Sequence, residues 1–206
     1  MKLKLISAFV IATVFAAPAF CDTIVFSSPT GTLGTSQVYG TGPNTVTVYG
    51  FVGTVTGTAT DLYGKNDGGS ENGVGIANAS DHEINTTNFV QLDLANISGA
   101  YTLSIGSTQD DEGFKVCFSN TLGTIGTTCT VFATPNTDPF TTSTFNKSQG
   151  QFISIQADNV HHTDSDNVLL DSLTFTPAAT PEPNSLILLG TGILGAAGMV
   201  RRKLSV

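Results

Sequence analysis

The sequence of 206 residues contains no tryptophan and only eight lysine and arginine residues. Without tryptophan, sugar rings lose the aromatic side chain that stacks on them best, so glycan binding would have to rely on tyrosine. Residues 22–180 hold fifteen acids but only three bases (Lys65, Lys115 and Lys147), a net charge of −12. This acidity excludes nucleic-acid binding, which depends on neutralising phosphates. It suits repulsion between copies and attraction of divalent cations.

Helical periodicity is also absent from residues 22–178. Short β-branched and aromatic runs alternate with Gly, Asn, Asp and Ser clusters, which is typical of an all-β domain. Strands are predicted at 24–26, 45–56, 58–63, 73–77, 89–94, 101–105, 114–118, 128–132, 151–156 and 168–176. The Gly/Thr-rich residues 30–45 are predicted to be a loop or an irregular edge. Ten strands of this length indicate one β-sandwich or jelly roll at 22–178, with its ten phenylalanines in the core.

Cysteine is scarce, with three residues in the chain. If Cys21 leaves with a signal peptide, Cys117 and Cys129 remain, and an even number outside the cytoplasm favours a disulfide. Antiparallel pairing of 114–118 with 128–132 about Gly123 would place the two cysteines opposite each other. Closing a loop of this size would contribute about 3 kcal/mol to stability.

Residues 1–21 have the pattern of a signal peptide. Lys2 and Lys4 precede an apolar run at 5–15, and small residues follow at 17–21. Cleavage after Cys21 or after Ala19 both fit the small-x-small rule. A lipoprotein with Cys21 as its lipidated N-terminus is the alternative, although the large Phe20 before it argues against that.

Residues 179–206 form a second targeting segment with three parts. Pro181, Glu182 and Pro183 are stiff and extended, residues 184–200 carry no charge, and Arg201, Arg202 and Lys203 follow. Seventeen uncharged residues reach the lower limit of roughly 17–25 for a transmembrane helix, which is predicted here. The basic flank would stay in the cytoplasm and the β-domain outside. A plain anchor and a processed anchor both fit this pattern.

The order of Pro181-Glu182-Pro183, apolar helix and basic end resembles the PEP-CTERM protein-sorting signal of Gram-negative bacteria. The resemblance implies that the protein is the substrate of an exosortase, a membrane transpeptidase-like enzyme linked to exopolysaccharide and biofilm production. It implies a membrane-anchored precursor in the inner membrane that is then moved to the cell surface or the extracellular space. Its partners would be the exosortase and signal peptidase during export, and extracellular polysaccharide afterwards.

Three acidic clusters could bind Ca²⁺ through converging oxygens, at 61–83, 110–112 and 161–166. Each is equally consistent with a solvated turn. His161 and His162 would point to opposite faces of an extended segment, which disfavours one shared metal. Residues 167–177 resemble the closing strand of carbohydrate-binding-module and galactose-binding-like jelly rolls, in which an Asp matching Asp171 binds calcium. The candidate calcium ligands are therefore Asp171, Asp67 and Glu71.

A catalytic constellation is missing from the sequence, since no G-x-S-x-G is present and no histidine is spaced to serve a serine. Glu71 and Glu83 are expected in a solvated loop. We therefore expect a non-enzymatic, exported surface or matrix protein with no cofactor beyond structural Ca²⁺. The alternative function is a calcium-assisted carbohydrate-binding module, with Tyr39 as the one tyrosine expected in a loop.

Overall fold

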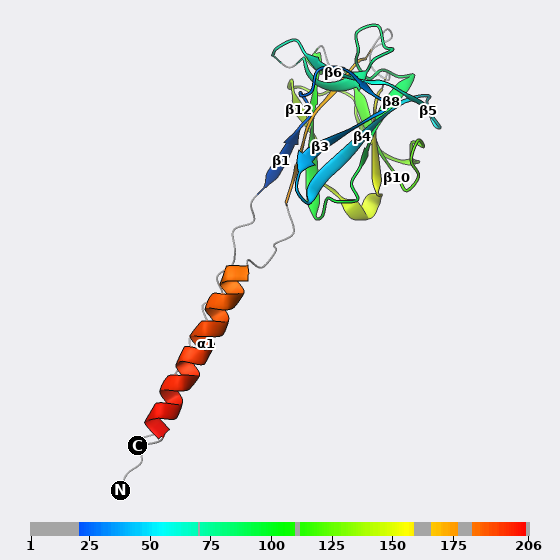
Figure 1. The fold of residues 1–206 in the computed structure, drawn as a ribbon. Helices are drawn as coiled ribbons and strands as arrows, with labels where there is room; N and C mark the ends of the chain where they lie inside the picture. Colours follow the sequence, from blue (N-terminus) through cyan, green and yellow to red (C-terminus); the bar gives the residue numbers. More distant parts are fainter. Residues whose placement is uncertain (1–20, 70, 110–111, 159–165, 177–182, 205–206) are drawn as a thin grey trace. The chain divides into compact units, whose positions relative to one another are not determined.

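A computed structural model describes residues 21–69, 71–109, 112–158, 166–176 and 183–204. The chain divides into two compact units, residues 20–178 and the two chain ends, 1–19 with 179–206 (Figure 1). The predicted signal peptide therefore lies outside the described residues, apart from Cys21, which is exposed.

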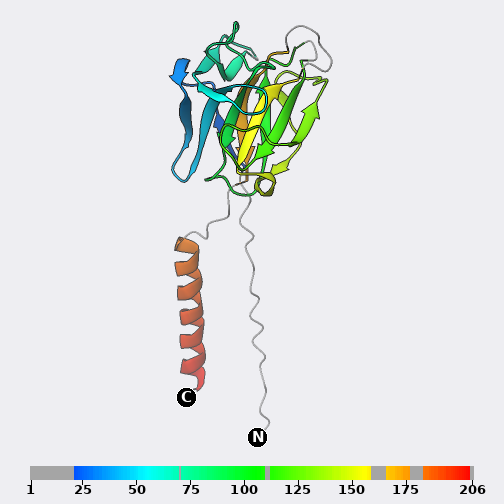
Figure 2. The ribbon, with the colours of Figure 1, turned by 90° about the vertical axis from the view of Figure 1, so that its right-hand side faces the viewer.

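Residues 20–178 form a sandwich of two antiparallel sheets, as the alternating apolar pattern predicts (Figure 2). Sheet A runs in the order β12-β9-β15-β7-β6-β2, with β1 also beside β15 and β13 also beside β9. Its strands are β1 (Asp22–Val25), β2 (Gly31–Gly34), β6 (Leu62–Asn66), β7 (Asn72–Ile76), β9 (Ala100–Gly106), β12 (Phe140–Thr141), β13 (Phe145–Asn146) and β15 (Leu169–Phe175). Figure 1 shows β1, in dark blue, lying alongside the orange β15.

Sheet B faces sheet A and runs in the order β11-β10-β14-β8-β4-β3, with β5 beside β4. Its strands are β3 (Ser36–Thr41), β4 (Asn44–Val52), β5 (Thr58–Thr60), β8 (Asn88–Asp93), β10 (Phe114–Ser119), β11 (Thr128–Phe132) and β14 (Phe152–Ala157). A short 3₁₀ helix, η2 (Lys147–Gln149), precedes β14. All ten predicted strand regions contain a strand, which confirms the all-β prediction.

The core between the sheets is aromatic, as predicted. Five phenylalanines belong to the main core cluster (Phe26, Phe114, Phe118, Phe145 and Phe175), and Phe132 and Phe140 are partly buried against it. Phe51 and Phe89 lie in a second, smaller cluster. Phe114 stacks on Phe132 with ring centroids 4.9 Å apart, and Phe140 meets Phe114 edge-on at 5.9 Å. Offset and edge-to-face pairs of this kind add about 0.5–1.5 kcal/mol each beyond their area burial.

Two loops cover part of the outer face of sheet B. Residues 53–57 and 120–127 hydrogen-bond to each other, since Ile125 N donates to Val55 O and Gly57 N donates to Gly123 O, both at 2.8 Å. Beneath them Phe51, Phe89, Cys117 and Ile125 form a second, smaller apolar cluster. As a result β14 is buried along its whole length.

Gln91, fully buried on β8, fastens the 120–127 loop to the sheet. Its Oε1 accepts from Gly123 N at 2.7 Å, and its Nε2 donates to Thr124 O at 3.1 Å and to Ser154 Oγ at 3.0 Å. The disulfide between Cys117 and Cys129 closes the same loop, because these residues are paired opposite each other on β10 and β11.

Residues 30–45 are predicted to be a loop or an irregular edge, and the structure shows the edge alternative. These residues contain β2 and β3, the edge strands of sheets A and B. β2 pairs only with β6, and β3 only with β4. Tyr39 is the one buried residue of these two strands, so their sequences lack the alternation of apolar and polar residues that marks the central strands. Tyr39, expected in an exposed loop, is instead buried on β3 and meets Phe26 edge-on at 4.9 Å.

Helix α1 (Pro183–Leu204) is the helix of the other unit. It forms where the sequence places it, but the expectation of a transmembrane helix is not met. No helix in the described part of the chain is long and apolar enough to cross a membrane. Its uncharged stretch is diluted by Gly190, Gly192, Gly195 and Gly198.

The cysteine pair should be a major contributor to domain stability. Replacing both cysteines (Cys117→Ala with Cys129→Ala) should lower the free energy of unfolding by about 3 kcal/mol, because the unfolded chain regains the entropy of the closed loop. Urea denaturation of the full chain measures the difference. The matched control is Cys21→Ala, which removes the exposed free thiol. Equal midpoints for the double variant and the control would contradict the assignment.

Candidate functional site

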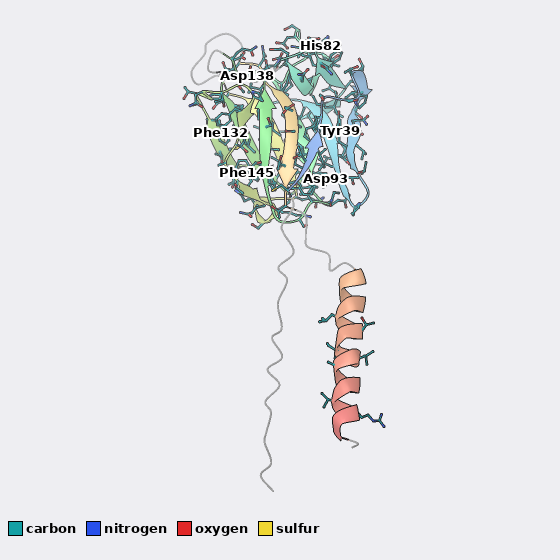
Figure 3. All side chains as sticks on the ribbon, turned by 90° about the vertical axis from the view of Figure 1, so that its left-hand side faces the viewer. Tyr39, His82, Asp93, Phe132, Asp138 and Phe145 are labelled. Atoms are coloured by element: carbon teal, nitrogen blue, oxygen red, sulfur yellow. A yellow bond between two sulfur atoms is a disulfide. The ribbon has the colours of Figure 1, made fainter. Side chains whose placement is uncertain are left out.

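Several charged side chains from sheet A and its connections meet beside the β6–β7 hairpin. Lys65 lies on β6, Glu71 lies in the turn before β7, and Glu83 follows β7. Ser107 and Gln109 follow the end of β9. Figure 3 labels His82, next to Glu83 in the chain, at the end of the domain opposite Asp93.

Lys65 is the shared cation of this cluster. Its Nζ donates to Glu71 Oε2 at 2.5 Å and also to Glu83 Oε1. The Ser107 hydroxyl lies 2.8 Å from Glu83 Oε2 and 3.2 Å from Glu71 Oε1, and Gln109 Nε2 donates to Glu71 Oε1 at 2.6 Å. The side chains of Lys65 and Glu83 are only 13% and 5% exposed, against 27% for Glu71. One ammonium group thus holds two carboxylates in a largely dry site.

The two glutamates differ in acidity because their surroundings differ. Burial raises the pKa of Glu83 to about 7, and the nearby charge of Glu71 acts in the same direction against the hydrogen bonds from Lys65 and Ser107. Burial also acts to raise the pKa of Glu71, but hydrogen bonds from Gln109 and Lys65 outweigh it and lower the pKa to about 2. Glu71 is therefore the carboxylate that keeps its charge, and Glu83 is the one that can be neutral.

The pKa of Lys65 is also set by opposing effects. Burial acts to lower the pKa of its ammonium group, but the hydrogen bonds and charges of Glu71 and Glu83 hold that pKa above its usual range.

Two residues that border the cluster have left-handed backbone conformations, which L side chains rarely adopt. Ser107 has φ 56° and His82 has φ 66°. Each such conformation costs on the order of 1–3 kcal/mol and persists only where the surroundings enforce it. His82 is fixed by stacking on Tyr63, with ring centroids 3.9 Å apart, and by its Nδ1, 3.0 Å from Ala77 O. The backbone therefore presents Ser107 and Glu83 to Lys65 in one fixed arrangement.

Gly75 on β7 makes the close approach of this segment possible. A Cβ at position 75 would lie 2.0 Å from the carbonyl oxygen of His82 and 2.8 Å from the Cα of Glu83. Only glycine fits, because both contacts are to backbone atoms that cannot move aside. The segment that carries Glu83 consequently lies directly against β7.

Glu112 is, with Glu83, a second carboxyl group whose charged form is disfavoured. Its Oε1 accepts from Asn167 N at 3.4 Å, whereas its Oε2 is buried with no hydrogen-bond partner among the described residues. Burial raises the pKa of Glu112 to about 8, with further contributions from the charges of Glu83, Asp166 and Glu71. The folded domain therefore favours the protonated form of this side chain at neutral pH.

The predicted calcium ligands occupy different surroundings. Asp67 is exposed in the β6–β7 turn, Glu71 belongs to the Lys65 cluster, and Asp171 is half-buried on β15 with its Oδ2 3.3 Å from Ser172 Oγ. Across the described ranges, no three His, Cys, Asp or Glu residues are grouped so as to hold a metal ion. Residues 110–111 and 161–165, from the other two acidic clusters, lie outside the described residues. The calcium hypothesis stays a prediction.

The expectation that Glu83 lies in a solvated loop is wrong, since Glu83 is only 4% exposed. Its burial depends on Ser107, which is 24 positions away and gives no sequence signal. One signal was available, because Lys65 is the one base within residues 61–83, where it accompanies five acids. A lone lysine in such a segment indicates a shared counter-ion.

The raised pKa of Glu112 predicts how stability depends on pH. Between its ordinary pKa of 4.5 and its folded pKa of about 8, the folded state retains a proton that the unfolded chain has lost. This group therefore makes stability fall as pH rises through that window. Glu112→Gln should remove this part of the fall, so its advantage over the unmodified chain should grow from about pH 5 to about pH 8. Urea unfolding at several pH values measures it.

The control for that experiment is Asp67→Asn, which also removes one negative charge but from an exposed turn. If the free energy of unfolding of Glu112→Gln and of the unmodified chain changed with pH in parallel, burial would not raise the pKa of the Glu112 carboxyl group.

Comparison with known proteins gives one family match, in the C-terminal segment. The family described as "PEP-CTERM protein-sorting motif" matches residues 179–203. No curated protein and no solved structure matches the chain.

The matched segment includes all the residues of the predicted sorting signal. Pro183 begins α1, and Arg201, which is exposed, is followed in the same helix by Arg202 and Lys203. Pro181 and Glu182 lie outside the described residues. This motif implies exosortase-dependent sorting of an exported protein. The chain therefore carries a PEP-CTERM protein-sorting motif at residues 179–203, C-terminal to a β-sandwich.

Proposed function

We propose that the β-sandwich is cargo, delivered by its C-terminal signal to the cell surface or the extracellular matrix, and that it turns over no substrate. The observation that carries the proposal is the PEP-CTERM motif at residues 179–203. Signal peptidase would remove residues 1–21, and the exosortase would process the C-terminal segment at the inner membrane. Extracellular polysaccharide is the partner that we propose at the destination.

The β-domain has physical properties that suit this destination. Its net charge of −12 opposes association between copies in solution. Its disulfide would persist in the oxidising space outside the cytoplasm. The basic residues outside the domain all lie in the two end segments, where positive charge guides membrane targeting.

The proposal that the domain is not an enzyme is supported by how its buried polar groups are used. Lys65, Glu71, Glu83 and Ser107 would be plausible acid–base groups, but each hydrogen-bonds to another member of the cluster. The carbohydrate-binding alternative loses support, because Tyr39 is buried and cannot stack on a sugar.

Sorting can be tested by following the protein in fractionated cells of its own organism. Deleting residues 181–206 should remove the protein from the surface or medium fraction, because the exosortase no longer meets its signal. Replacing Pro181, Glu182 and Pro183 together by alanine should also remove the protein from the surface or medium fraction, although it alters just three residues.

The matched control is Asn184→Ala, which alters the next residue and leaves the tripeptide intact. A strain without its exosortase should reproduce the effect on the unmodified protein. Unchanged localisation of the deletion variant would refute the sorting function.

We further propose that the domain folds without a cofactor. Binding of Ca²⁺ by Glu71 would have to displace its contacts with Lys65, Gln109 and Ser107. Titration calorimetry of the full chain with CaCl₂ should therefore give no binding heat. Saturable heat that disappears in Asp171→Asn but survives in Asp61→Asn would instead establish the calcium site.

A further inference from the structure

We propose that the side chains of Lys65 and Glu83 become joined by an intramolecular amide bond, Nζ to Cδ, which forms spontaneously in the folded domain. The proposal rests on the arrangement of four side chains. Lys65 Nζ contacts a carboxylate oxygen of Glu83, Glu71 Oε2 lies 2.5 Å from the same nitrogen, and Ser107 Oγ lies 2.8 Å from the other oxygen of Glu83. Lys65 would be the nucleophile and Glu83 the acyl group. Glu71 would be the base, and Ser107 would donate to the oxyanion.

The fold supplies the proximity that this condensation needs. Lys65 is held on β6 between strands β2 and β7, and the Glu83 segment is pressed against β7 at Gly75. Groups fixed in contact can reach effective concentrations on the order of 10⁵ M or more. The lysine and Glu83 side chains are 13% and 5% exposed, so little water is present to reverse the reaction.

The reaction balances within the cluster. The Lys65 ammonium must first give one proton to the Glu83 carboxylate, which yields a neutral amine and a neutral acid. Because the pKa of Lys65 is held above its usual range, the neutral amine is a minor species and this transfer limits the rate. Nζ then attacks Cδ, and the Ser107 hydroxyl donates to the oxygen that becomes negative. Glu71 takes a proton from Nζ and returns it to the departing hydroxyl of Glu83. The C–O bond breaks, one water leaves, and Glu71 ends as the carboxylate that it was at the start.

Glu83, rather than Glu71, is the acyl group for two structural reasons. Glu83 is the more deeply buried, and its acid form is favoured by that burial. Glu71 is stabilised as a carboxylate by Gln109 Nε2 at 2.6 Å in addition to Lys65, so it is the deprotonated carboxylate of the cluster and can relay a proton from Nζ. The left-handed backbone at Ser107 and at His82 holds the donor and the acyl group in place.

The bond would add a second covalent tie to the domain. The disulfide closes the β10–β11 hairpin in sheet B, whereas an amide from Lys65 to Glu83 would tie β6 to the segment after β7 in sheet A. Unlike a disulfide, it would not depend on an oxidising environment.

Peptide mapping of the full chain gives a direct test. After unfolding and reduction, trypsin should fail to cleave after Lys65, because an acylated lysine carries no charge. Lys65 and Glu83 should therefore stay in one tryptic peptide, residues 5–115 of the full chain, at a mass one water below that of its sequence. Cleavage after Lys115 in the same digest is the internal control.

Two variants distinguish the bond from a simple ion pair. Lys65→Arg keeps the positive charge but cannot form the amide, so its mass should equal that of its sequence. Glu71→Gln keeps the shape of the side chain but removes the base. The domain should still fold, but without the amide, so trypsin should cleave after Lys65 once the chain is unfolded. Full tryptic cleavage after Lys65 in the unmodified, folded protein would overturn the proposal and leave an ion pair only.

Discussion

The contact between Lys65 and Glu83 is the interaction on which one end of the sandwich depends. The acidic domain has only three bases, and this one is placed where two carboxylates are taken out of water. Removing one partner of a buried pair leaves a charge without compensation, at a cost of about 3–5 kcal/mol. The β6–β7 hairpin, the segment after β7 and the left-handed turn at Ser107 all converge on this contact.

Burial of both faces of sheet B is the second organising feature. One face packs against sheet A around the phenylalanine core, and loops 53–57 and 120–127 cover part of the other. Gln91 fastens the second loop through three hydrogen bonds, and the disulfide fixes the strands that it connects.

Local patterns in the sequence predicted the features that depend on local contacts. Alternation at Val46 and Val48 placed β4, and symmetry about Gly123 placed Cys117 opposite Cys129. Edge strands β2 and β3 were predicted only as a loop or an irregular edge, because Tyr39 is their one buried residue and leaves little alternation to read. The Lys65 cluster escaped because Glu83 is buried by residues distant in the chain, whereas its own neighbours resemble an exposed turn.

Charge is distributed unevenly between the β-domain and the two ends of the chain. Five of the eight bases lie in the end segments and fifteen of the sixteen acids in residues 22–180, so the two end segments differ in charge from the β-domain. The most direct measurement is mass-spectrometric identification of the C-terminus of the surface-located protein. Exosortase-dependent sorting predicts a mature chain that has lost Arg201, Arg202 and Lys203 in cells that contain the exosortase. A surface protein that retains them would contradict this account.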